Sequence, residues 1–175
     1  MENAAPIAAD SNFASAVAGV SSLDGDSVPE VAVGAPFYDD GALSDCGAVV
    51  IVFLNSEGSV ASHTVLTASS DNMPSLTDYD GFGVSVADVG SITGTGVRDI
   101  VVGSQQYEGN SFGGGLFVLA LSSTGTSLGS WTLSSGASYS GPPINDGDNF
   151  GCAVALGPSD LSNEDGGGKR VVGAD

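Results

Sequence analysis

The sequence predicts an all-β fold of β-propeller-type blades, each built from four antiparallel strands, with about two and a half repeats in this chain. Two observations predict it: the chain repeats itself, and no helical periodicity appears in its apolar segments. The repeat is marked by Phe13, Phe82 and Phe150, which fall 69 and 68 residues apart. Each Phe is followed by an apolar segment, a polar loop and a Val-Gly segment. A fixed period of this length indicates stacked supersecondary units.

The first two segments of each unit read as a hairpin. Bulky and small residues alternate from each Phe, as in Phe82, Val84 and Val86 against Gly83 and Ser85, which predicts an innermost strand close to neighbouring backbone. The partner strand is short, Val-rich and Gly-containing. It is expected at residues 30–35, 99–104 and 169–174.

The third and fourth segments differ in polarity. Residues 48–54 (AVVIVFL) and 115–121 (GLFVLAL) are apolar at every position, which is typical of a strand covered on both faces. Residues 60–67 and 127–134 are more mixed and fit an outer strand, reached through Gly-containing turns. Four strands in a repeated unit are the pattern of a propeller blade.

The repeat divides the chain into domains. We expect a flexible lead-in at 1–12, a first blade at 13–81, a second at 82–149 and the first half of a third at 150–175. Closed propellers have about four to eight blades. Two and a half blades do not close, so we expect their unpaired strand edges to be covered by another part of the protein or by another chain. These edges can be paired by further repeats of the same protein or by other copies of the chain, and the sequence leaves both alternatives open.

Composition excludes several classes of function. The chain has 3 Lys and Arg against 21 Asp and Glu, so its net charge of −18 disfavours nucleic acid and anionic membrane surfaces. Such acidity suits either a solvated, salt-tolerant surface or a demand for divalent cations, and both can hold together. No apolar run is long enough for a membrane span, and the first residues, MENAAPIAAD, lack a signal-peptide pattern.

Two cysteines, Cys46 and Cys152, stand at non-equivalent places in the repeat. Two cysteines do not make a disulfide-rich miniprotein. A long-range disulfide and a pair of buried free thiols both remain open.

The motif residues resemble a known family. Phe-Gly opens the second and third units, and Val33, Gly34, Ala35 and Pro36 close the second strand of the first. This pattern is similar to the FG-GAP repeat of integrin α-chain propellers, and the resemblance runs from Phe13 onward. It implies blades of four antiparallel strands and a calcium loop between the first two strands, patterned Asp-x-Asp-Gly-Asp-Gly-x-x-Asp.

Carried onto the first unit, the resemblance places that loop at Ser22–Glu30, SLDGDSVPE. Asp24, Asp26 and Glu30 then stand at carboxylate positions, Ser22 replaces the first aspartate, and Val28 offers its carbonyl. Calcium binds several oxygens at about 2.3–2.6 Å, and alternate residues of a tight loop can direct them to one point. The alternative is a plain Asp-Gly hairpin turn without metal.

The other two loops are weaker calcium candidates. The second carries hydroxyls where carboxylates are expected, so an unmetalled turn is predicted there. The third is longer and has Lys169 at the position of the terminal acid. For the acids that precede each Phe, solvated linker carboxylates are favoured over a further cation site. The matched positions are Ser91, Thr93, Thr95 and Asp99 in the second loop, Asp160, Ser162, Glu164 and Asp165 in the third, and Asp78, Asp80, Asp146 and Asp148 in the linkers.

No catalytic constellation is found in the sequence. The lone histidine, His63, has no linked motif, and no nucleophile elbow, zinc pattern or phosphate loop occurs. We therefore expect a non-enzymatic protein. The resemblance to integrin α-chain repeats further implies a secreted or cell-surface location, structural calcium, and a role in adhesion or in a surface filament through protein partners or self-assembly. The alternative is a carbohydrate-binding propeller module, in which Trp131 would stack on a glycan. For Trp131 a hydrophobic contact on the outer strand is favoured, because the matching position of the first unit holds Thr64 or His63 and no aromatic residue. A hydrolase or lyase ranks third.

Overall fold

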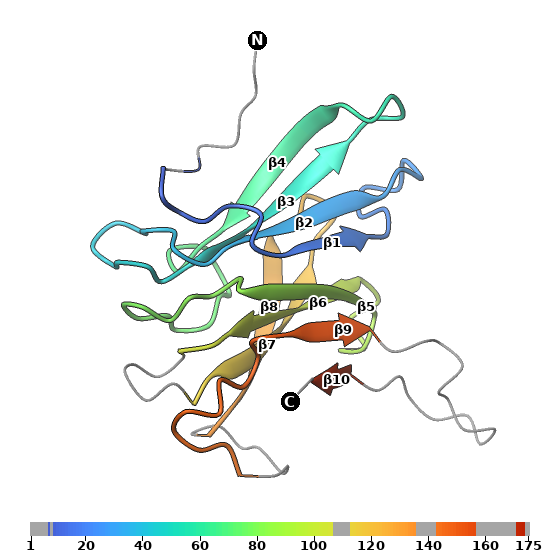
Figure 1. The fold of residues 1–175 in the computed structure, drawn as a ribbon. Coiled ribbons are helices and arrows are strands. Elements are labelled where there is room, and N and C mark those ends of the chain that lie inside the picture. Colours follow the sequence, from blue (N-terminus) through green and yellow to red (C-terminus); the bar gives the residue numbers. More distant parts are fainter. Residues whose placement is uncertain (1–6, 8, 107–112, 136–142, 157–170, 174–175) are drawn as a thin grey trace, which may run out of the picture.

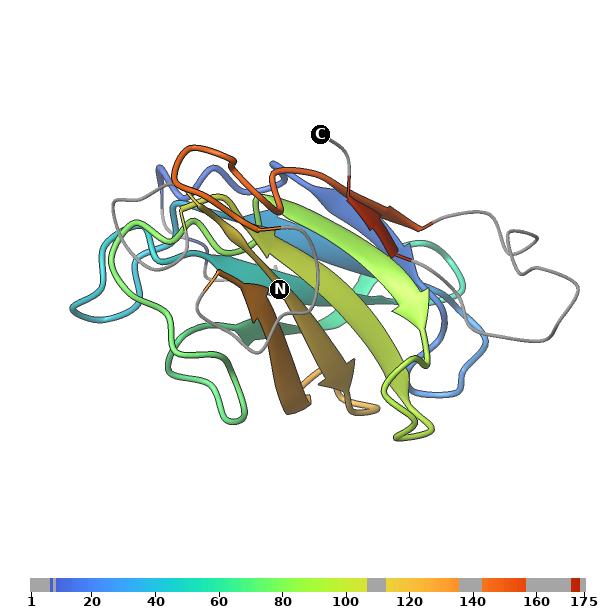
Figure 2. The same ribbon diagram turned by 90° about the horizontal axis from the view of Figure 1, so that it is seen from below.

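A computed structural model describes residues 7, 9–106, 113–135, 143–156 and 171–173. Among these residues there are ten strands and no helix, so the predicted all-β class is confirmed. Figures 1 and 2 show two four-stranded sheets as separate layers, with a short pair of strands beyond the second sheet. Every strand pairing is antiparallel.

The first sheet follows chain order. It comprises β1 (Val17–Val20), β2 (Glu30–Ala35), β3 (Ala48–Leu54) and β4 (Val60–Leu66), with each strand bonded to the next. Five of the seven residues of β3 are buried, as its unbroken apolar sequence predicts, whereas the first three residues of β4 are exposed. β4 is therefore the outer strand and β3 an interior one.

The second sheet repeats this arrangement. It comprises β5 (Ser85–Gly90), β6 (Arg98–Ser104), β7 (Gly115–Leu121) and β8 (Ser127–Ser134). Six of the seven residues of β7 are buried. The remaining strands, β9 (Val154–Leu156) and β10 (Val171–Gly173), pair with each other. The two four-stranded sheets are consistent with blades of a propeller.

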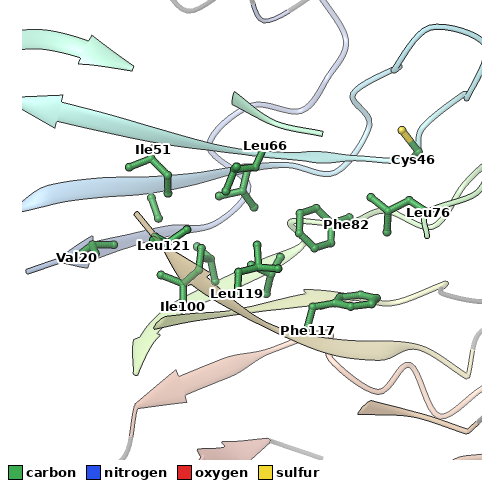
Figure 3. Close-up of a cluster of buried hydrophobic side chains, with 14 of the residues drawn as sticks. Val20, Cys46, Ile51, Leu66, Leu76, Phe82, Ile100, Phe117, Leu119 and Leu121 are labelled. Atoms are coloured by element: carbon green, nitrogen blue, oxygen red, sulfur yellow. The ribbon is translucent and has the colours of Figure 1, made fainter. Parts of the chain in front are cut away.

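The core lies between the two sheets (Figure 3). Phe82, in the segment that connects them, packs with its ring centroid 5.5 Å from that of Phe117 in β7, and both side chains are fully buried. Ile51 of β3 belongs to the same apolar cluster. Burial of this continuous cluster stabilises the face-to-face packing of the sheets.

The Phe-Gly pairs precede the first strands instead of starting them. We expected strands from Phe13 and Phe82, but β1 begins at Val17 and β5 at Ser85. Gly83 has a φ of +97°, in the left-handed region, where an extended strand cannot continue. Ala14, at the matching position of the first unit, has a φ of +68°. The alternation of bulky and small residues therefore begins before the strand does, and the predicted strand starts at the Phe residues are wrong.

The face of the first sheet that points away from the second is rich in valine. Val17, Val33 and Val50 are register partners on this face, because the alternate residues of the same strands belong to the core between the sheets. Val17 is 60% exposed and Val31 and Val52 are partly exposed, whereas Val33 and Val50 are buried, so this face is only partly open to solvent. The equivalent residues of the second sheet form its interface with the first. They are Val86, Ile100, Val102, Phe117 and Leu119, which correspond to Val17, Val31, Val33, Val50 and Val52.

Candidate functional site

The loop between β1 and β2 brings three carboxylates together. β1 and β2 are antiparallel neighbours, with Val20 opposite Glu30, so residues 21–29 form a compact connection. Carboxylate oxygens of Asp24, Asp26 and Glu30 all lie within 4.8 Å of one another. Asp24 and Asp26 are exposed, whereas Glu30 at the start of β2 is 1% exposed. Hard cations are bound by such sets of oxygens.

Ser22 organises the loop around these acids. Its Oγ accepts hydrogen bonds from the backbone N–H groups of Gly25 and Ser27, each at 3.2 Å. The same hydroxyl lies 3.5 Å from Oδ1 of Asp24 and 3.5 Å from Oδ1 of Asp26. The hydroxyl oxygen therefore lies beside both exposed carboxylates, at the position that the resemblance assigns to a ligand.

The remaining hydrogen bonds fix the carboxylates in place. The N–H of Asp26 donates to Asp24 Oδ1 at 3.1 Å, and the N–H of Val28 donates to Asp26 Oδ1 at 2.7 Å. Glu30 Oε2 accepts from the N–H of Leu23 at 2.9 Å, which ties the two ends of the loop together. Backbone donors thus hold carboxylate oxygens toward the loop interior before any cation binds.

The electrostatics of the loop favour a positive ligand. Burial raises the pKa of Glu30 above its usual value, and the negative charges of Asp24 and Asp26 raise it further, against the lowering effect of backbone hydrogen bonds. Desolvation and like charges both disfavour the ionised carboxylate. A cation among the three groups would reverse both effects.

The second loop has a different internal arrangement. Asp99 is fully buried, and its Oδ2 accepts from the N–H groups of Ile92 at 2.6 Å and Thr93 at 2.7 Å. Asp99 Oδ1 accepts from the Thr93 hydroxyl at 3.0 Å, and that hydroxyl lies 2.9 Å from the Thr95 hydroxyl. Protein donors thus occupy the single carboxylate of the loop. Ser91 is exposed at its start.

The third loop lies outside the described residues. This applies to Asp160, Ser162, Glu164, Asp165 and Lys169.

The linker acids correct one expectation. Asp80 is fully buried, not solvated, and accepts hydrogen bonds from the N–H of Thr77 at 2.7 Å and from its hydroxyl at 3.1 Å. Asp148 is exposed and closes the matching turn by accepting from the N–H of Asn145 at 2.7 Å. Both carboxylates therefore stabilise the turn before the Phe.

Neither the cysteines nor the aromatic candidate belongs to the acidic loop. Cys46 and Cys152 are free thiols, and Cys152 is exposed, so neither a disulfide nor a pair of buried thiols is correct. Burial raises the pKa of Cys46. Trp131 is 45% exposed on β8, as expected for an outer strand. His63 lies half-buried on β4.

One link between the loop and the second sheet has no signal in the sequence motif. Arg98 Nη2 lies 2.6 Å from Asp88 Oδ2 and donates to Ser21 Oγ at 2.6 Å. Asp88 Oδ2 also accepts from the N–H of Ser21 at 3.3 Å. Ser21 directly precedes the ligand candidate Ser22, so the residue that leads into the acidic loop is hydrogen-bonded to the second sheet. Only the packing of the sheets brings these residues together.

Comparison with known proteins gives a partial match to an integrin α chain. Integrin alpha-3 from Mus musculus is 35% identical over 101 residues, which is 55% of this chain and 8% of that protein. The chain therefore spans less than a tenth of the length of this relative, and over the matched segment it is similar to an integrin-like repeat. No protein-family model matches the chain. The described residues include no helix that could cross a membrane.

Proposed function

We propose that this chain is a non-enzymatic, extracellular binding or structural protein, whose integrin-like repeats are stabilised by calcium and serve in adhesion or in a surface assembly. The observation that carries the proposal is the convergence of Asp24, Asp26 and Glu30 in one hairpin loop. The partial similarity to an integrin α chain supports the surface role. Repeat units at 13–81, 82–149 and 150–175 are part of this proposal.

Calcium has a structural role in this proposal. Its ligands are Ser22, Asp24, Asp26 and Glu30 through side-chain oxygens and Val28 through its carbonyl. A bound calcium supplies the positive charge that the clustered carboxylates lack. Because Ser21 is bound to Asp88 and Arg98 of the second sheet, ordering this loop also stabilises the contact between the two sheets.

Isothermal titration of the chelator-treated chain with calcium tests the site. We expect one cation, and a melting temperature higher by about 5–10 °C at 100 times the dissociation constant. The double variant Asp24→Asn, Asp26→Asn should abolish both effects. The matched control, Asp71→Asn with Asp146→Asn, removes the same charge from exposed positions outside the loop and should bind calcium as the parent does.

The stoichiometry of that titration distinguishes the loops. A second cation that persists in the Asp24→Asn, Asp26→Asn variant would assign a site to the set Asp160, Ser162, Glu164 and Asp165. The second loop, with Ser91, Thr93, Thr95 and Asp99, is proposed to stay metal-free because protein donors already occupy its carboxylate. Heat release with no calcium dependence of the melting temperature would contradict a structural role.

The proposed partner is another sheet of the same kind, either a further repeat or a second copy of the chain. The support is the partly exposed valine face of the first sheet, with Val17 as its exposed residue, because the equivalent positions of the second sheet pack against the first. Light scattering over a range of concentrations tests the second copy. Self-association should be lost in Val17→Asp and kept in Val60→Asp, which alters an exposed valine of the outer strand. A parent chain that stays monomeric at every concentration would leave only further repeats as the cover.

A further inference from the structure

A cavity of about 270 Å³ opens between the two sheets, at the end opposite the acidic loop. It is lined by the segment before β1, by the connection from β2 to β3, by the linker before β5 and by the residues after β6. In Figure 1 the β1–β2 loop lies at the right-hand end of the first sheet and the β2–β3 connection at the left. The cavity is therefore separate from the proposed calcium site.

Two exposed aromatic side chains line this cavity. Phe37 is 51% exposed and Tyr79 is 54% exposed. Large aromatic side chains are normally placed where they bury area. Neither belongs to the apolar cores between the sheets. Their exposure in a concave site leaves ring surface available to a ligand.

The repeat itself shows that the fold does not require these aromatics. Counted from the Val-Gly glycine, the position of Phe37 in the first unit is occupied by Gln106 in the second. Counted back from the next Phe, the position of Tyr79 is occupied by Gly147. Both aromatics are thus special to the contact between the first and second units.

Backbone strain accompanies the cavity. Asn12, Asp45 and Tyr79 line it and have φ values of +52°, +48° and +67°, in the left-handed region. For a bulky residue such as tyrosine this conformation is unusual and costs free energy. It is held by hydrogen bonds from the N–H of Tyr79 to the Ser44 carbonyl at 2.8 Å and from the N–H of Gly81 to the Asp45 carbonyl at 3.1 Å. The Tyr79 ring is therefore presented from a fixed backbone.

The polar groups around the rings indicate the ligand. Asn12, Gln105 and Gln106 offer amides that both donate and accept hydrogen bonds, and Asp45 offers a carboxylate acceptor. Among the described residues, no lysine or arginine lines the cavity, and the net charge of −18 disfavours anions. Ring faces with amide groups and one carboxylate acceptor at the edge match a sugar ring, which has apolar C–H faces and a belt of hydroxyls.

We propose that this cavity is a binding site for a neutral saccharide, with Phe37 and Tyr79 stacking on the ring and Asn12, Asp45, Gln105 and Gln106 bonding its hydroxyls. The cavity volume of about 270 Å³ lies just below the usual range for ligand pockets, so the site suits one sugar residue, such as the end of a glycan chain. This site gives the protein a glycan partner independently of calcium.

Saturation-transfer NMR with a panel of neutral hexoses and their disaccharides tests the proposal, using the whole chain in the presence of a chelator. We expect binding of at least one sugar, weakened about tenfold or more in Phe37→Ala and in Tyr79→Asn. Asparagine tolerates the left-handed backbone, so the second variant keeps the fold. The control is Trp131→Ala, which removes an exposed aromatic from β8, outside the cavity, and should leave binding unchanged.

Three outcomes would overturn this proposal. The first is that no neutral sugar in the panel binds. The second is that sugar binding is lost in Trp131→Ala and kept in the two cavity variants. The third is that guanidinium or tetramethylammonium, and no sugar, binds in a manner that requires Tyr79, because the cavity would then be a cation site formed by an aromatic ring and Asp45. Since the assay is run without calcium, failure of the calcium proposal does not affect it.

Discussion

Gly34 in β2 and Gly83 before β5 are in direct backbone contact across the two sheets, and a Cβ atom on Gly34 would overlap the carbonyl oxygen of Gly83. The same contact recurs one unit later, between Gly103 and Gly151. One glycine comes from the Val-Gly segment and the other from the Phe-Gly pair of the next unit. The repeated motif is therefore explained by packing, because its glycines let adjacent sheets approach at their first strands.

Replacement of Gly34 by alanine should destabilise the protein strongly. The added methyl group forces the sheets apart at a backbone contact, and overpacking of this kind costs about 1–3 kcal/mol or more. Urea unfolding followed by circular dichroism measures the loss. Gly19→Ala is the matched control, since Gly19 lies in β1 with open space around its Cβ position. Equal effects of the two substitutions would refute the explanation of the motif.

Replacement of Ala14 by glycine should stabilise the protein. Ala14 has a φ of +68° at the position where the later units carry Gly83 and Gly151, with φ values of +97° and +88°. Relief of the left-handed strain, less the larger entropy of glycine in the unfolded chain, gives a gain of about 0.5–1 kcal/mol.

Thermal unfolding measures this gain, with Ala16→Gly as the control. Ala16 lies outside the positive-φ set and packs against the core cluster, so its replacement should lower the melting temperature. A lower melting temperature for Ala14→Gly would show that φ at this position is not strained.

Loss of the Arg98 side chain should weaken the link between the acidic loop and the second sheet. Arg98 bonds Asp88 and Ser21 at 2.6 Å each, from a partly exposed position. Arg98→Met is expected to cost about 1 kcal/mol, the upper range for an exposed pair. A double-mutant cycle with Asp88→Asn isolates the interaction. A coupling energy of zero at low salt would show that the contact does not hold the sheets.

Glu30 should make the metal-free protein less stable as pH rises. Its pKa is raised from 4.5 in the folded state, so folded protein holds this proton more tightly than unfolded protein does. The free energy of unfolding therefore falls as pH increases from below 4.5 through the raised pKa.

The variant Glu30→Gln tests this pH dependence. In chelator it should be more stable than the parent at pH 7, and the advantage should vanish below the usual glutamate pKa. In calcium the order should reverse, because the variant lacks a charged ligand. Chemical unfolding across pH 3.5–7.5 measures both curves. Parallel curves for parent and variant would show that Glu30 is not the titrating group.

Much of the fold follows from the pattern of the sequence. The Phe spacing and the unbroken apolar runs at 48–54 and 115–121 predict repeated four-stranded sheets with buried third strands, and β3 and β7 have this burial. Period-two patterns do not reveal φ, so the starts of β1 and β5 were placed too early. A linker carboxylate can either be solvated or accept hydrogen bonds within a turn, and the sequence does not distinguish these two roles. The burial of Asp80 therefore does not follow from the sequence.

The candidate sites differ in how far the sequence could reach them. Residues 22–30 are local, so a spacing motif was sufficient to propose that Asp24, Asp26 and Glu30 converge. The cavity is assembled from four segments, and Phe37 and Tyr79 belong to different connections of the fold. Its only trace in the sequence is a departure from the repeat at these two positions, which becomes informative once the packing of the sheets is known.

The valine face on the first sheet means that neighbouring units offer apolar side chains at matching positions along the stacking direction. At the positions by which the second sheet packs on the first, the first sheet also carries apolar side chains. Val17 and Val33 match Val86 and Val102, and valine stands in place of the larger Ile100, Phe117 and Leu119. If a unit were inserted or removed at matching points of the repeat, apolar faces would still meet on both sides of the change. Variation in the number of units is thus an evolutionary change that preserves the apolar packing. Substitution of a contact glycine, in contrast, disturbs the packing between two neighbouring units, because each contact joins a glycine from one unit to a glycine from the next.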